Sequence, residues 1–443
     1  MPENWMISAG WESMSGGLPE ECACFAALEI QANEECLTEG RDGLANRLRR
    51  APLLSAYHLA EWLAWNWWRL RWEPRPSSNS EEWAFAHRLS TIGGGYIWPD
   101  ITIFSDGQRI ALIAKSTKAR AETPYRYISN SAVFISADEF EAGIDEFIEQ
   151  VLERLQSEHI KDSNLASIWD SVTEERKSPE LAYRRKLEAL LGNDPDESDE
   201  RLIRQLIQDA RQLGTSAIEE LAAGHDEIGR IPTAKEFDDL ANQRGVQVST
   251  RDGVNVTINV NRSAGQIPAW QIGYNFAHVL RIQEQLGEEP VDDARLVELL
   301  GVSQSVFSGN AAQSALGISF ELDNENNANE GRLVLCSNKR KTGQRFDLAR
   351  ILGDRLINSR ADGRLYPVTR AYTSRQQAQR AFAAELLSPF AQVRAMLHDD
   401  CSQENLSDIA YHFGVSELTI RTMLVNHGVL DRYDLTSDFQ MAS

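Results

Sequence analysis

Hydrophobic and polar residues alternate in several short runs in the first third of the chain, and this pattern predicts strands. The run 24–33 alternates as a strand with one buried face does. Runs 99–104 and 109–115 flank turn residues at 105–107, which predicts a strand–turn–strand unit. A further strand is predicted at 131–136. The N-terminal part is therefore expected to contain antiparallel sheet.

Apolar residues at helical spacing predict helices over most of the remaining chain. In 137–156, for example, Phe140, Ile144, Phe147 and Val151 share one face. Other helices are predicted at 55–71, 164–191, 200–214, 215–224, 272–286, 292–300 and 345–356, with a helical pair within 406–430. Strands followed by helices in a chain of 443 residues predict a multidomain α+β protein.

An acidic, proline-containing run near 193–200 is the predicted linker, because such composition is typical of exposed connections. It lies inside a predicted helical connector, 161–225. An N-terminal α+β domain is expected at 1–160 and a second, mainly helical domain at 226–443.

The charge distribution limits the partners that the chain is expected to bind. A net charge of -21 repels nucleic-acid phosphates, so general nucleic-acid binding is not expected. Segment 339–380, however, holds eleven Lys and Arg residues against three Asp. Nucleic acid is expected to bind only there, and internal neutralisation of that segment is the alternative. No apolar run reaches the length of a membrane span, so we expect a cytoplasmic protein without membrane contact.

Three sequence motifs follow one another in the C-terminal half. The first reads Arg-Phe-Asp-Leu-Ala-Arg-Ile-Leu-Gly-Asp over 345–354, and the second reads Phe-Ala-Ala-Glu-Leu-Leu-Ser-Pro over 382–389. The third, Phe-Gly-Val-Ser at 413–416, lies in the last helical pair. Together they resemble the ImmA/IrrE family of zinc metallopeptidases. The resemblance implies a zincin-like domain with a C-terminal helical pair.

The residues that would carry zinc chemistry in that family differ in this chain. Its two His ligands fall on Arg350 and Asp354, its general-base Glu falls on Ile351, and its acidic third ligand falls near Gln376 and Gln377. Zinc hydrolysis needs lone-pair ligands and a carboxylate base, and neither Arg nor Ile supplies one. We therefore expect no zinc, no metal ligands, no other cofactor and no catalytic residue, which makes the domain a pseudo-peptidase.

Two roles remain open for the substituted positions. Arg350 and Asp354 are four residues apart on one helix and could pair with each other in the abandoned cavity. Alternatively, Arg345, Arg350 and Arg355 could bind an anion or an acidic residue of a partner. The resemblance implies a protein-interaction or sensor component of a bacterial regulatory, toxin–antitoxin or phage-defence system, with a helix-turn-helix repressor or antitoxin as partner.

An enzyme is the alternative interpretation, either a cryptic metallopeptidase or a nuclease. Pro99-Asp100 and Lys115 on the following strand resemble the PD-(D/E)xK nuclease pattern, in which carboxylates hold Mg²⁺ and a lysine assists the attacking water. The second acidic position of that pattern is occupied by Ile113.

Overall fold

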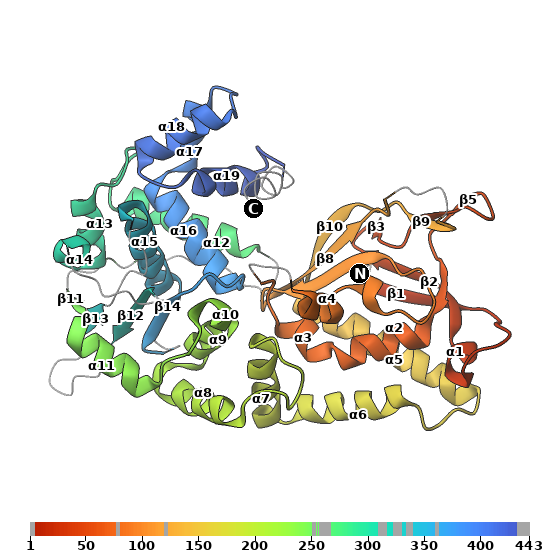
Figure 1. Cartoon of the computed structure of the whole chain (residues 1–443). Coiled ribbons are helices and arrows are strands. Elements are labelled where there is room, and N and C mark those ends of the chain that lie inside the picture. The colour runs from red at the N-terminus through yellow and green to blue at the C-terminus, as the bar shows by residue number, and fades with distance from the viewer. Residues whose placement is uncertain are drawn as a thin grey trace. The chain divides into compact units, whose positions relative to one another are not determined.

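The structure is a computed structural model that describes residues 5–76, 80–118, 123–249, 254, 256, 267–308, 317–321, 330–333, 340–358 and 363–431. It divides into two compact units, shown in Figure 1. Unit 1 extends to Ile203 and unit 2 begins at Arg204. The expected α+β architecture is present, with N-terminal antiparallel sheets followed by a largely helical C-terminal region.

Three antiparallel sheets lie in the described part of unit 1. The first has the order β1-β2-β3 with β6 beside β2, the second β10-β8-β7 and the third β5-β4-β9. The expected strands are confirmed, and their bounds differ from the predicted ones by at most one residue. Alternation along each strand places one of its sides in the core. Their bounds are β1 Trp5–Trp11, β2 Phe25–Ala32, β3 Glu35–Cys36, β4 Gly40–Asp42, β5 Arg47–Arg49, β6 Leu53–Ser55, β7 Asp100–Ser105, β8 Arg109–Lys115, β9 Tyr125–Tyr127 and β10 Ser131–Ser136.

The helices of unit 1 bury their apolar faces in one core with these sheets. The predicted helix 137–156 is α5, which a capping box of Ser136 and Glu139 starts. The predicted helix 55–71 is interrupted at Asn66, whose side chain donates to the Trp62 carbonyl at 2.8 Å. The helices are α1 Pro19–Ala23, α2 Ala56–Trp65, α3 Trp67–Trp72, α4 Glu81–His87, η1 Leu89–Thr91, α5 Ala137–Ser157, α6 Asn164–Lys177 and α7 Pro179–Leu190.

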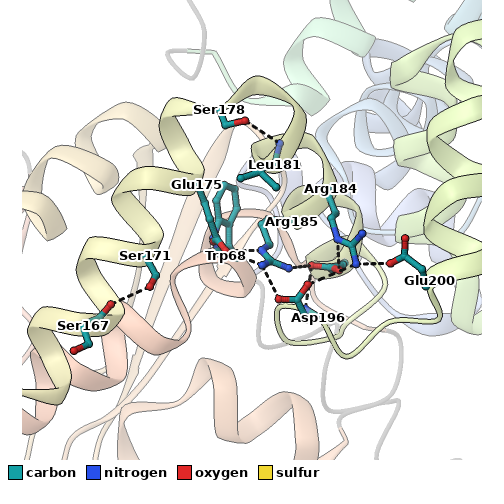
Figure 2. A network of polar contacts seen from close by, with 11 residues as sticks. Trp68, Ser167, Ser171, Glu175, Ser178, Leu181, Arg184, Arg185, Asp196 and Glu200 are labelled. Atoms are coloured by element: carbon teal, nitrogen blue, oxygen red, sulfur yellow. Dashed lines mark hydrogen bonds and ion pairs between the residues drawn. The ribbon is translucent and has the colours of Figure 1, made fainter.

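The acidic run predicted as a linker is fastened to α7, as Figure 2 shows. Arg185 donates to Asp196, Glu175 and Glu188, each at 2.8 Å. Arg184 reaches Glu200 at 2.6 Å. The run therefore packs against unit 1 as a fixed segment just before the unit boundary, and the predicted connector 161–225 is divided between the two units.

Unit 2 has a sheet of order β11-β13-β12-β14 and a bundle of helices around its own core. Helix α13 starts at the Asp292 cap and ends at Gly301, which has a positive φ of 72°, as its sequence signals predict. The bounds are α8 Glu200–Leu213, α9 Thr215–Ala223, α10 His225–Ile228, α11 Ala234–Arg244, β11 Val246–Ser249, α12 Ala269–Gln283, α13 Asp293–Leu300, α14 Ser305–Ser308, β12 Gly317–Glu321, β13 Glu330–Leu333, α15 Lys341–Ile357, β14 Leu365–Val368, α16 Ser374–Leu387, α17 Phe390–Leu397, α18 Gln403–Phe413 and α19 Glu417–Asn426.

Helix α15 is enclosed by its neighbours, since every residue from Asp347 to Asp354 is buried. Two glycines allow close helix packing in this bundle. A Cβ at Gly273 of α12 would lie 2.0 Å from the Ala378 carbonyl of α16, and a Cβ at Gly353 would lie 2.6 Å from the Phe382 ring. Among the described helices, none combines the length and apolarity needed to cross a bilayer.

Candidate functional site

The two helices α15 and α16 hold the positions that the zinc motif would occupy. Arg350 and Asp354 lie on α15, and Gln376 lies on the facing helix α16. The structure brings these elements together, because the Arg350 Nη2 atom donates to the Gln376 Oε1 atom at 2.5 Å. Positions that the family resemblance would assign to one metal site are therefore neighbours in space.

The side chain of Arg350 lies inside unit 2, where it donates hydrogen bonds to several acceptors. It is 5 % exposed, and its Nη2 atom also donates to the Thr369 carbonyl at 2.7 Å and lies 3.4 Å from Gln379 Oε1. Gln376 accepts from the Thr369 amide at 3.0 Å and donates to the Pro367 carbonyl at 3.1 Å. The guanidinium is thus enclosed by carbonyl and amide oxygens contributed by α16 and by the end of β14.

Burial lowers the pKa of Arg350 to about 9, and the nearby charge of Arg380 acts in the same direction. A pKa of about 9 still leaves the group cationic at neutral pH. A positive charge at this position repels a divalent cation, and guanidinium nitrogens offer no lone pair. The site chemistry therefore opposes zinc at Arg350.

Asp354 pairs with Arg375 on α16 instead of with Arg350. The Arg375 Nε and Nη2 atoms donate to the two carboxylate oxygens at 2.8 and 2.7 Å, and Asn358 adds a bond at 2.7 Å. Asp354 is fully buried, so this two-point contact matches the fork of a guanidinium. The cation that pairs with Asp354 is therefore supplied by the facing helix α16. The four-residue spacing of charged residues within α15 does not reveal this partner.

The remaining substituted positions have simpler surroundings. Ile351 is fully buried in the apolar core of unit 2. Gln377 is partly exposed, and its Nε2 atom donates to the Tyr372 carbonyl at 3.1 Å. Of the two glutamines expected near the third-ligand position, Gln376 is the one that reaches the site.

Helix α9 contributes polar groups that the sequence motifs did not indicate. Ser216 accepts from Arg375 at 2.8 Å, and buried Glu220 accepts from the Thr373 hydroxyl at 2.7 Å. Burial raises the pKa of Glu220, while the Arg375 charge opposes that rise. The start of α16 is therefore covered by α9, which closes this side of the site.

The three arginines expected as binding groups have internal contacts. Arg345 is 8 % exposed, pairs with Asp293 and donates to the Val291 carbonyl at 2.5 Å. Arg355 lies 3.4 Å from the Leu300 carbonyl. With Arg350 buried as well, these side chains are directed to internal acceptors, and the structure gives Arg345 and Arg350 no exposed guanidinium for a partner to contact.

The wider basic segment 339–380 is also neutralised in part. Besides the pairs above, Lys341 pairs with Asp293 at 2.5 Å, and the Arg370 Nε atom lies 3.7 Å from Glu227. Arg370 remains 80 % exposed at its side chain. Lys339 and Arg360 lie outside the described residues.

Glu385, in the second motif, is an unusual buried acid. It is 2 % exposed and accepts from the Phe390 amide at 2.8 Å, which caps the start of α17. The His278 Nδ1 atom lies 3.7 Å away. Burial raises the pKa of Glu385 to about 7. Within the described ranges, no three His, Cys, Asp or Glu side chains gather as metal ligands would.

The nuclease-like pair lies in unit 1 on adjacent strands. Asp100 of β7 is directly opposite Lys115 of β8 in the antiparallel register. Asp100 also pairs with Arg88, at 2.8 Å from Nη2, and Ile113 is opposite Thr102. The lysine and one carboxylate are therefore adjacent, and the second carboxylate of the pattern is missing.

Comparison of the chain with protein-family profiles, with curated proteins and with solved structures gave no match.

Proposed function

We propose that this chain is a non-catalytic ImmA/IrrE-like pseudo-peptidase that acts as a protein-interaction or sensor component in a bacterial regulatory, toxin–antitoxin or phage-defence system. The observation that carries this proposal is the convergence of Arg350 and Gln376 from α15 and α16. These positions correspond to the zinc motif in the sequence resemblance, and in space they form a guanidinium–amide contact.

The local chemistry supports a role without hydrolysis. A zinc peptidase must hold the metal with neutral imidazole or carboxylate groups and must deprotonate a bound water. Here the only carboxylate among the substituted positions, Asp354, is bound at both oxygens by Arg375. Ile351 stands where the base would be and cannot accept a proton. The fold of such a domain can still present a surface to a partner.

The partner that the resemblance implies is a helix-turn-helix repressor or an antitoxin. Since Arg345 and Arg350 are buried, we propose that contact is made by exposed groups around the site rather than by the substituted positions themselves. Arg370, with its exposed side chain, is one such group.

Two measurements test the proposal. After incubation with zinc and desalting, elemental analysis is expected to find far less than one zinc per chain. Helix-turn-helix proteins of the native host that bind the chain in a two-hybrid screen are expected to stay intact when incubated with it. One tightly held zinc per chain, lost in Asp354→Ala, or cleavage of the partner would contradict the proposal.

A nuclease is the second candidate, and the register of Asp100 and Lys115 is the observation in its favour. We expect no cleavage of DNA or RNA with Mg²⁺ or Mn²⁺, because Ile113 replaces the second acid and Arg88 already binds Asp100. Cleavage that Asp100→Ala abolishes, and that Asp106→Ala in the nearby turn leaves unchanged, would establish the nuclease instead.

A further inference from the structure

We infer that unit 1 binds the phosphate backbone of duplex DNA through one face of the β5-β4-β9 sheet, a role that goes beyond the proposed interaction function. The face is defined by Arg41, Arg126, Lys118 and Leu48. None of these residues belongs to the basic segment 339–380.

The register places two arginines of this face side by side. Arg41 of β4 lies opposite Arg126 of β9 on one flank and opposite Leu48 of β5 on the other. Directly opposed residues in an antiparallel pair project from the same side, with Cα atoms about 4.5–5.5 Å apart. Two like charges at that separation repel each other, so the arrangement favours an anion that contacts both.

One lysine extends the positive row. The Thr117 amide donates to the Tyr127 carbonyl at 2.9 Å, so residues that follow β8 run beside β9. Lys118 follows Thr117 on this segment and is exposed. Among the described residues, no carboxylate forms an ion pair with Lys118, with Arg41 or with Arg126, and the described contact of Arg41 is with Asn46 at 3.1 Å.

The acids near this face are mostly committed elsewhere. Asp42 pairs with Arg49 at 2.9 Å and accepts the amides of Leu44 and Ala45 in the hairpin turn. Glu39, just before β4, remains as a flanking acid. In a chain of net charge -21, cations left without acidic partners form a local site for a polyanion.

The shape of the β4–β5 hairpin favours duplex DNA over other polyanions. Its side chains Leu44 and Leu48 are 88 % and 62 % exposed, which is unusually high exposure for leucine. A two-stranded ribbon fits the major groove of B-DNA, where apolar side chains contact thymine methyl groups. The narrow major groove of duplex RNA does not admit such a ribbon.

The test is fluorescence anisotropy of the full chain with a labelled DNA duplex at 50 and 200 mM salt. Three phosphate contacts predict a salt slope near −2.7, so affinity should fall about 40-fold between these salts. Arg41→Ala/Arg126→Ala removes two contacts and should reduce that fall to about 3.5-fold. Lys118→Ala removes one contact and should reduce the fall to about 12-fold, and Arg41→Lys/Arg126→Lys should retain binding. Arg394→Ala, at an exposed position of α17 in unit 2, is the control and should behave as the unmodified chain.

Several outcomes would overturn the inference. These are the absence of duplex binding at 50 mM salt, an unchanged salt slope in both Arg41→Ala/Arg126→Ala and Lys118→Ala, or a loss of binding in Arg394→Ala alone. Tighter binding of single-stranded DNA, duplex RNA or polyglutamate than of duplex DNA would assign the face to a different partner. Circular dichroism melts of each variant separate lost binding from lost folding.

Discussion

At the scale of single residues, the buried charges of unit 2 matter most. The guanidinium of Arg350 and the carboxylate of Asp354 lie on one helix, yet each finds its hydrogen-bond partners on another element. Burying charged groups is unfavourable unless hydrogen bonds and opposite charges compensate. Removing one partner should therefore lower the free energy of unfolding by the full cost of burying the remaining charge.

A double-mutant cycle tests this pairing. Arg375→Ala leaves Asp354 buried and unpaired, which should destabilise unit 2 by about 3–5 kcal/mol. The coupling energy between Asp354 and Arg375, measured by chemical denaturation, should exceed that between Asp354 and Arg350. A larger coupling to Arg350 would mean that the intrahelical pair expected from spacing dominates.

Glu385 gives a prediction about pH. Its folded pKa of about 7 exceeds the ordinary value of 4.5, so between these values the folded state binds more protons than the unfolded state. Stability contributed by this group is therefore present below pH 4.5 and declines as pH rises toward 7, by up to about 3 kcal/mol. Glu385→Gln should raise the melting temperature relative to the unmodified chain at pH 8 but much less at pH 5. Exposed Glu288→Gln should show no such dependence, and an equal shift at both pH values would refute the assignment.

At the scale of helices and strands, close packing rests on glycine. Gly273 lets α12 approach the α16 backbone, and an added methyl group would meet the Ala378 carbonyl at 2.0 Å. Gly273→Ala should destabilise unit 2 by about 1–3 kcal/mol, as overpacking does. Gly10→Ala in β1, where the nearest atoms lie at 3.8 Å, is the matched control and should be close to neutral. Similar denaturation midpoints for both variants would contradict this account.

The comparison of sequence and structure is clearest at this scale. Strand β10 and helix α5 were predictable because their hydrophobic periods and the Ser136 cap are local signals. The contacts that fix the acidic run 193–200 could not be read from the run itself, since Arg184 and Arg185 lie on another helix. Likewise the Arg375–Asp354 pair joins two helices, and no periodicity within one helix encodes such a contact. Contacts of α9 with α16 were missed for the same reason.

At the scale of the whole molecule, two separate hydrophobic cores are present, one in each unit. Calorimetry should therefore resolve two unfolding transitions. Gly143→Ala, whose added methyl group would lie 2.2 Å from the Trp5 ring, should lower one transition, and Gly273→Ala should lower the other. A single transition that both substitutions shift equally would show that the cores unfold together.

The row of Arg41 and Arg126 also has a kinetic consequence. On a protein of net charge -21, a small positive face produces a strong charge asymmetry within unit 1. A polyanion that approaches most of the protein surface is repelled, and one that approaches this face is attracted. The electric field therefore orients the two molecules for binding before they make contact. Association by this face should then accelerate at low ionic strength, whereas the lifetime of the complex should depend on the hairpin contacts.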